Sequence, residues 1–387
     1  MVNVAVVGLG FMGVTHLRAY LRLPGVRIAA LCASRHLPEN GDFSSVSGNI
    51  AMGEPLRLDM TGVRATRDFE SLLSDPGIDL IDLCVPTPRH VELATRALRA
   101  GKHVICEKPL ARTAAQAREI LAAAREARGF FMPAMCLRFW PGWTWLKQTV
   151  EAGTYGAVKA ARFRRVGEAP AWGRDVYLNG AVSGGALLDL HIHDVDFVQH
   201  LFGRPKAVYA QGVGFHSGAI DHVVAQYTVA NGAAVSAEGS WAMATGHGFN
   251  MAYTVVFERA TADYDLARGN DALKVFEDGR GGRVVPPEPG DGYIGELGYM
   301  AECIEKGRAP RHVTAEDGVS AVEICEAEEE SIRTGRPVAL RQQFTQFHRS
   351  RRRRTSVAVQ LPARQPQQGR LQRWPTRQLL RDRQRGV

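Results

Sequence analysis

The fold of this chain is decided by its N-terminal stretch, Val4-Ala5-Val6-Val7-Gly8-Leu9-Gly10-Phe11-Met12-Gly13. The four residues before Gly8 form a short, continuous apolar run, which is typical of a strand buried on both faces. Residues 15–23 then have a helical pattern that stops at Pro24-Gly25, and residues 26–32 have the pattern of a second strand. The order strand, glycine-rich turn, helix, strand predicts a βαβ unit.

The same alternation of apolar strands and helices continues along the chain, at residues 78–85, 91–99, 103–106 and 113–128. Repeated βα units imply a parallel sheet with helices on both faces. We therefore predict an α/β Rossmann dinucleotide-binding domain at residues 1–128. The polar stretch of residues 35–58 is too long for an ordinary connection, and we expect a surface insertion near the binding site.

Beyond about residue 156 the apolar residues recur with a period of two. This period predicts strands at residues 158–166, 207–213, 223–229, 233–241 and 253–257. Asn231-Gly232 predicts a two-residue hairpin turn, and one long helix is expected at residues 185–202. Two further helices are expected at residues 294–305 and 316–334. We predict an α+β domain at residues 129–340 with a large, open, mainly antiparallel sheet.

The positive charge of the chain is concentrated in its last residues. The 387 residues carry a formal net charge of +8, whereas residues 341–387 alone hold 13 Arg and one acid, a balance of +12. This Arg-rich tail lacks apolar periodicity and is predicted to be disordered. Either non-specific contact with an anionic surface or an appended, out-of-frame extension would explain it. Because the rest is acidic, we expect no specific nucleic-acid partner.

Other compositional features are those of an ordinary cytoplasmic protein. Hydrophobic residues make up 45% and charged residues 23%, and no stretch is apolar enough to cross a membrane. The N-terminus has no signal-peptide pattern. The six cysteines never form Cys-x-x-Cys, so buried free thiols are expected.

The glycine-rich turn carries the first functional signal. In this spacing, Gly8 permits the tight turn, Gly10 lets the backbone approach a pyrophosphate, and Gly13 lets helix and strand pack closely. The helix that follows presents free N–H groups to the phosphates, which places Phe11 and Met12 at the cofactor. A purely structural glycine turn is the alternative interpretation.

The end of the second strand indicates which nicotinamide cofactor is preferred. An NAD site usually has an acid there, but this chain has Ser34 and Arg35 and no Asp or Glu before Glu39. A hydroxyl and a guanidinium suit a 2′-phosphate, so NADP is favoured over NAD. Alternatively, Arg35 stacks over the adenine and either cofactor is accepted.

Four blocks of sequence resemble the Gfo/Idh/MocA family of oxidoreductases. They are the glycine motif with His16 after it, Pro86-Thr87-Pro88-x-His90, residues 100–109 ending in Glu107-Lys108-Pro109, and residues 184–196 containing Asp189-x-x-x-His193. The resemblance spans residues 2 to about 340, and the Arg-rich tail has no counterpart in it.

This resemblance implies catalytic roles for Lys108, Asp189 and His193. Hydride transfer from an alcohol leaves a hydroxyl proton, and histidine is suited to accept it near neutral pH. Lys108 can stabilise the developing alkoxide. Asp189 and His193 are four apart on the expected helix, so they share a face and Asp189 can orient substrate and histidine. A helix-capping or core pair is the structural alternative for Asp189 and His193.

The resemblance also indicates other site residues. Pro86, Thr87, His90 and Glu107 are expected near the nicotinamide and its ribose. Alternatively, Thr87, Pro88 and His90 simply form a turn, and Glu107 pairs with a neighbouring Lys. His191 stands where many relatives have glycine, so it narrows the substrate pocket or simply packs. Among several aromatic residues, Trp172, together with Arg138, is predicted to contact substrate. No metal is expected, because His191 and His193 face different sides of a helix.

The predicted function is an NAD(P)-dependent dehydrogenase or reductase. It would act on a hydroxyl or ketone of a sugar, sugar derivative or cyclitol, in a homodimer or homotetramer. Two alternatives stay open: an NAD-dependent glycosidase that uses transient oxidation and elimination, and a catalytically silent sugar or nucleotide sensor.

Overall fold

The computed structural model describes residues 1–387 except 36, 49–53, 171–172, 287 and 342–387. Met1–Gln342 forms one compact unit. The predicted Arg-rich tail and Trp172 lie outside the described residues.

The first domain is built on a parallel, six-stranded sheet in the order β3-β2-β1-β4-β5-β6. All neighbouring strands run parallel. This order is that of a Rossmann fold and confirms the predicted α/β architecture, with the order reversing between β1 and β4. The strands are β1 (Val2–Val7), β2 (Val26–Cys32), β3 (Arg64–Thr66), β4 (Leu80–Leu83), β5 (His103–Glu107) and β6 (Phe131–Ala134).

Helices connect these strands as the βα pattern predicts. They are α1 (Phe11–Tyr20), α2 (Phe69–Leu73), α3 (His90–Arg99) and α4 (Ala114–Glu126). The side chain of Thr113 accepts a hydrogen bond from the Gln116 N–H and so begins α4. Because β6 belongs to the first sheet, this sheet continues past the expected domain boundary at residue 128.

The second domain contains a nine-stranded sheet in the order β14-β13-β12-β11-β7-β10-β9-β8-β15. Neighbouring strands are antiparallel except for the parallel pair β7 and β10. The predicted open, mainly antiparallel sheet is thus confirmed. The strands are β7 (Val158–Glu168), β8 (Ala207–Val213), β9 (His222–Thr228), β10 (Ala234–Met243), β11 (Asn250–Phe257), β12 (Ala260–Asp265), β13 (Leu273–Glu277), β14 (Gly281–Val284) and β15 (Val338–Ala339).

The turn at Asn231-Gly232 is longer than expected. Thr228 pairs with Ala234, so residues 229–233 connect β9 to β10. Gly232 has a φ of +76°, which favours glycine, and the Ala233 N–H donates to the Asn231 side chain.

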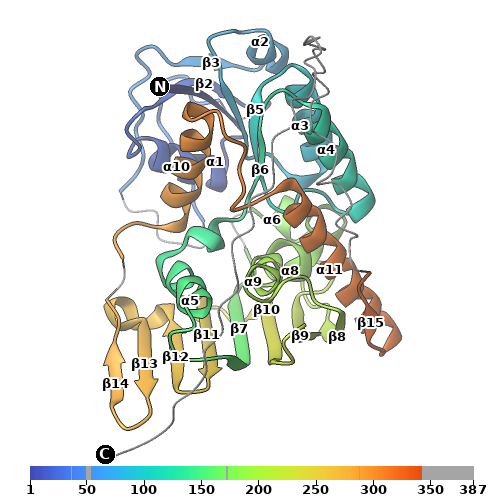
Figure 1. Cartoon of the computed structure of the whole chain (residues 1–387). Helices are drawn as coiled ribbons and strands as arrows, with labels where there is room; N and C mark the ends of the chain where they lie inside the picture. The colour runs from blue at the N-terminus through green and yellow to red at the C-terminus, as the bar shows by residue number, and fades with distance from the viewer. Residues whose placement is uncertain (36, 49–53, 171–172, 287, 342–387) are drawn as a thin grey trace, which may run out of the picture. The chain divides into compact units, whose positions relative to one another are not determined.

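Helices pack against one face of the second sheet (Figure 1). They include α5 (Pro141–Glu151), α8 (Gly185–Asp189), α9 (Ile192–Phe202) and α11 (Ala315–Thr334), and two short helices, α6 (Arg174–Tyr177) and α7 (Gly180–Ser183), precede α8. Short 3-10 turns are η1 (Thr87–Arg89), η2 (Cys136–Phe139) and η4 (Leu266–Asp271).

The helix expected at residues 185–202 is in fact two helices. At the break, the N–H groups of Leu190 and His191 both donate to the carbonyl of Ala186, at 3.0 and 2.8 Å. Regular hydrogen bonding resumes when Val195 donates to the carbonyl of His191. The break separates Asp189, which ends α8, from His193, which lies in the first turn of α9.

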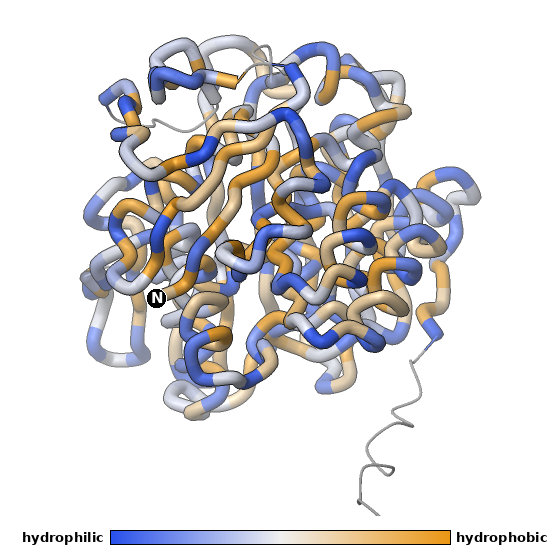
Figure 2. The backbone as a smooth tube through the Cα atoms, turned by 90° about the horizontal axis from the view of Figure 1, so that it is seen from above, coloured by the Kyte–Doolittle hydropathy of each residue, from blue (hydrophilic) through white to orange (hydrophobic). Residues whose placement is uncertain are grey.

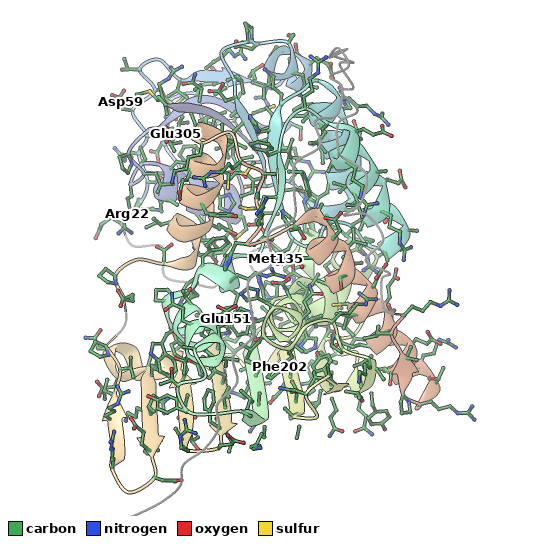
Figure 3. The ribbon with its side chains drawn as sticks, in the orientation of Figure 1. Arg22, Asp59, Met135, Glu151, Phe202 and Glu305 are labelled. Carbon is green, nitrogen blue, oxygen red and sulfur yellow. The ribbon has the colours of Figure 1, made fainter. Side chains whose placement is uncertain are left out.

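Two C-terminal helices join the domains. α10 (Gly292–Glu305) returns to the first domain and packs on α1, while α11 packs on α4 and β8. Apolar residues run along the interior strands and helices (Figure 2), and the buried side chains form one core cluster across both domains. Met135, labelled in Figure 3, is fully buried where β6 leads into η2.

Candidate active site

The glycine turn has the geometry that its spacing predicts. Gly8 has a φ of +95°, and a Cβ atom there would lie 2.5 Å from the carbonyl oxygen of Cys84. A Cβ on Gly13 would lie 2.0 Å from the carbonyl oxygen of Gly8, so helix and turn pack too closely for a side chain. Gly10 faces open space within 4 Å. The turn therefore leaves room for a phosphate beside the N-terminus of α1.

A cavity of about 830 Å³ adjoins this turn and is lined by both domains. Many of the predicted site residues line it: Gly8, Gly10, Phe11, Met12, Ser34, Arg35, Pro86, Thr87, Glu107, Lys108 and Asp189. Residues 45–47, from the expected insertion, also line the cavity, so the insertion does lie near the site.

Lys108 joins the two halves of this cavity. It follows β5 in a cis peptide bond to Pro109, and its Nζ donates to the backbone carbonyl of Asp189 at 2.6 Å and to Asp189 Oδ1 at 3.2 Å. The Lys108 and Asp189 side chains are 12% and 18% exposed, so the ion pair is largely shielded from water. An ammonium and a carboxylate from different domains thus meet at the cavity wall.

The charge of Lys108 affects the pKa of His193. Burial, then Lys108 and Arg165, hold the pKa of His193 well below its usual value. Its Nδ1 is buried, and within the described residues it has no hydrogen-bond partner. The ring is therefore neutral near pH 7. His193 does not itself line the cavity. Within the described residues, its side chain makes no hydrogen bond to Asp189 or Lys108.

His90 supports the cavity from behind. Its ring nitrogens contact the carbonyl oxygens of Pro109 at 2.9 Å and Val85 at 2.8 Å, which ties together the segments after β4 and β5. Burial lowers the pKa of His90. His90 therefore positions Pro86 and Lys108 and does not line the cavity. Gly13 does not line the cavity either, because it lies beneath the turn.

Arg138 does not line this cavity but a second one of about 480 Å³, and its contact with substrate stays a prediction. Its guanidinium donates to both carboxylate oxygens of Asp196 at 2.7 and 2.6 Å and to Asp317 at 3.2 Å. It is 3% exposed. These bonds tie η2 to α9 and α11.

His191 also packs in the core instead of narrowing the pocket. Its Nε2 lies 3.3 Å from Glu328 and 3.2 Å from the hydroxyl of Tyr227. Burial alone would lower the pKa of His191, but Glu328 raises it. A Cβ on Gly239 would approach the His191 side chain to 2.5 Å, so the ring fills the space that this glycine leaves.

Among the cavity residues to which the sequence assigned no role are Arg67 and Tyr177. Arg67 Nη1 donates to the carbonyls of Arg35 at 3.0 Å and Ser34 at 3.4 Å, which places a second guanidinium beside the predicted 2′-phosphate position. Arg67 follows the three-residue strand β3, which no periodicity reveals. Tyr177 lines the cavity from the second domain, and its aromatic character was the one available signal.

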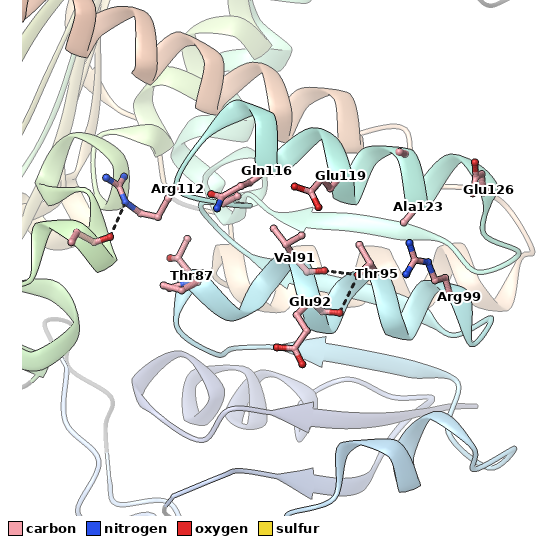
Figure 4. Close-up of a pocket in the computed structure, with 14 residues that line it drawn as sticks. Thr87, Val91, Glu92, Thr95, Arg99, Arg112, Gln116, Glu119, Ala123 and Glu126 are labelled. Atoms are coloured by element: carbon pink, nitrogen blue, oxygen red, sulfur yellow. Dashed lines mark hydrogen bonds between the residues drawn. The ribbon is translucent and has the colours of Figure 1, made fainter.

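A surface groove of about 940 Å³ lies between α3 and α4 (Figure 4). Acidic Glu92, Glu119 and Glu126 line it together with Arg99 and Arg112. Arg112 donates to the carbonyl of Ala181 at 3.3 Å. Lys108 and Asp189 do not line this groove, although Thr87 lines both it and the candidate cavity. Within the described residues, no helix is long and apolar enough to cross a membrane.

Known proteins resemble this chain in sequence and fold. Levoglucosan dehydrogenase of Pseudarthrobacter phenanthrenivorans is 29% identical over 215 residues, covering 54% of this chain and 53% of that protein. The trans-1,2-dihydrobenzene-1,2-diol dehydrogenase of Mus musculus is 32% identical over 168 residues, or 42% of this chain and 48% of that protein. The chain therefore spans about half the length of these relatives.

A solved structure of levoglucosan dehydrogenase in complex with NADH and levoglucosan matches over 88% of this chain and 100% of its own, with a TM-score of 0.75 and 25% identity. Residues 2–135 match the oxidoreductase family with an NAD-binding Rossmann fold. Residues 143–263 match the GFO/IDH/MocA C-terminal domain. With both characteristic domains in order, the chain belongs to the Gfo/Idh/MocA family of oxidoreductases.

Proposed function

We propose that this protein transfers a hydride between NAD(P) and a hydroxyl or ketone carbon of a sugar, sugar derivative or cyclitol. The observation that carries this proposal is the Lys108–Asp189 ion pair on the wall of a cavity that begins at the glycine turn. The relative that was solved with NADH and levoglucosan supports both the cofactor and the substrate class.

The residues present fit a dinucleotide. The open space at Gly10 and the N-terminus of α1 suit the pyrophosphate, while Ser34 and Arg35 suit the adenosine end. Pro86, Thr87 and Glu107 line the opposite part near Lys108, where the nicotinamide would lie. When bound, the nicotinamide supplies the carbon that accepts or donates the hydride.

The proton of the substrate hydroxyl is handled by the protein. Neutral His193 can accept it during oxidation and return it during reduction. The ammonium of Lys108 stabilises negative charge that develops on the substrate oxygen. Asp189 holds this ammonium at the cavity wall. We therefore assign His193 as acid/base, Lys108 as the electrostatic and proton-relay partner, and Asp189 as the orienting group.

We further propose that NADP is the preferred cofactor. Arg35 and Arg67 both line the adenosine end of the cavity beside Ser34, and two guanidinium groups suit a 2′-phosphate better than a free hydroxyl.

A homodimer or homotetramer is also part of the proposal. One face of the second sheet packs against helices, whereas the other exposes apolar side chains such as Val224 and Val256, at 43% and 39%. Such a face is suited to a second copy of the chain. Light scattering of the purified protein measures this directly, and a monomer would contradict it.

Turnover of a sugar and cyclitol panel with both nicotinamides tests the function. We expect reduced cofactor to accumulate with at least one polyol. Cofactor binding without any turnover would favour a silent sensor. Release of nitrophenol from a model glycoside with retained cofactor would favour a glycosidase.

A further inference from the structure

The carboxylate of Glu107 on the cavity wall is backed by a buried imidazole. His16 lies on α1 and is fully buried. Its Nε2 is 3.2 Å from Glu107 Oε1, and its Nδ1 is 2.8 Å from Asp82 Oδ2. The second oxygen of Glu107 accepts a hydrogen bond from the Lys108 N–H at 3.0 Å. His16 thus bridges two carboxylates, that of Glu107 at the end of β5 and that of Asp82 in β4.

The charges of these groups follow from their contacts. Burial alone would lower the pKa of His16, but Asp82 raises it well above its usual value. Burial alone would raise the pKa of Glu107, but the nearby His16, at 3.2 Å, and the charge of Lys108 lower it. An imidazolium therefore lies between two carboxylates, and the group of three carries one net negative charge.

The other groups that face His16 are neutral. Glu296 of α10 is fully buried, its Oε1 lies 3.8 Å from His16 Nε2, and burial raises its pKa well above its usual value. Burial likewise raises the pKa of Cys84, whose Sγ is 3.3 Å from His16 Nδ1. Tyr20 and Tyr293 have pKa values raised by burial. Because the charge of Lys108 is paired with Asp189, the negative charge of Glu107 is not cancelled.

We propose that His16, Asp82 and Glu107 form a buried ion triad that keeps Glu107 ionised at the cavity wall, so that the protein binds the oxidised nicotinamide more tightly than the reduced one. The oxidised ring carries a positive charge and the reduced ring does not, so a fixed anion distinguishes them. His16 is then a positioning residue. The inference rests on the proposed nicotinamide function, but binding alone tests it, and no substrate is needed.

The experiment compares dissociation constants for oxidised and reduced cofactor in the full-length protein by calorimetry. In His16→Gln, the preference for the oxidised form should fall about tenfold, mainly through weaker binding of that form. The affinity of His16→Gln for the oxidised cofactor should also fall as pH is lowered from about 8 to about 6. Without His16, burial raises the pKa of Glu107, so its carboxylate is protonated in this range and loses its negative charge. The wild-type affinity should change little over that range.

Two further variants make the test specific. Glu107→Gln should lose the same preference but without the pH dependence, and combining it with His16→Gln should add little. Glu296→Gln replaces a neutral acid by a neutral amide outside the triad, so the preference should stay at the wild-type value. An unchanged preference in Glu107→Gln, or a loss in Glu296→Gln equal to that in His16→Gln, would overturn the proposal.

Two measurements on the wild-type protein remain decisive if His16→Gln does not fold. Nitrogen NMR of His16 should show an imidazolium at about pH 7.5, above the usual histidine pKa of about 6.5. A neutral ring there would overturn the triad. His16, Asp82 and Cys84 also have the donor types of a metal site, so stoichiometric metal in the purified protein, with loss of the preference on chelation, would overturn it as well.

Discussion

At the residue scale, the site depends on how its positive charges are paired. Lys108 is paired with Asp189, and Arg138 is paired with Asp196 and Asp317. Burial, Lys108 and Arg165 lower the pKa of His193, and Arg165 is itself paired with Asp194 at 2.8 Å. The structure therefore favours a neutral imidazole as the base and an ammonium as the electrostatic partner.

Lys108→Ala should lower kcat by about 10²- to 10³-fold, because it removes the charge that stabilises the substrate oxygen. Cofactor affinity should change little. Steady-state kinetics and cofactor titration measure both quantities, with Lys306→Ala, a half-exposed lysine just after α10, as the control. Normal turnover in Lys108→Ala would contradict the assignment.

The pH profile should show that His193 is a weak base. Since burial, Lys108 and Arg165 lower its pKa, the ring stays deprotonated below the usual value of about 6.5. The kcat/KM for alcohol oxidation should therefore begin to fall only below about pH 6.5, and His193→Ala should lose most of kcat. An acidic limb at higher pH would argue against His193 as the base.

The adenosine end gives a separate prediction. Arg35→Asp and Arg67→Ala should each shift the kcat/KM ratio from NADP toward NAD, by about tenfold or more for the charge reversal. Arg64→Ala is the control, because Arg64 pairs with Asp75 and does not line the cavity. A cofactor ratio that stays the same in both variants would refute our interpretation of the second strand.

At the scale of elements, the turn between β1 and α1 is set by local sequence, whereas the break between α8 and α9 is set by tertiary contacts. The turn needs glycine where a side chain would collide with the backbone, and the glycine spacing in the sequence predicts these positions. The break lies where His191 enters the core against Gly239 and Glu328. Glu328 comes from α11, far along the chain, so no local pattern could predict that His191 is structural or that the helix divides.

Two glycines in the turn should respond differently to substitution. Gly13→Ala should destabilise the fold by about 1–3 kcal/mol, because its Cβ would overlap the Gly8 carbonyl. Gly10→Ala should cost well under about 1 kcal/mol but weaken cofactor binding, because the new methyl group occupies the phosphate space. Thermal unfolding and cofactor titration separate the two effects, and equal stability losses would contradict these roles.

At the scale of the whole molecule, the site exists because two domains share one cavity. The Rossmann order and the residues at the ends of β1, β4 and β5 could be predicted, since short-range patterns specify them. The partners of Arg138 and the position of Arg67 could not be predicted. Only the tertiary fold brings α9 and α11 to Arg138, and Arg67 after β3 to Arg35. Of the three predicted catalytic residues, Lys108 and Asp189 are in direct contact.

Deuterium transfer from the substrate carbon to the cofactor is a direct test of the proposed hydride transfer. The protein is incubated in ordinary water with polyols deuterated at carbon, and the nicotinamide ring of the reduced cofactor is analysed by mass spectrometry. We expect one deuteron per reduced cofactor from at least one sugar or cyclitol, and almost none with His193→Ala. Bound cofactor that gains no deuterium from any polyol in the panel would contradict it.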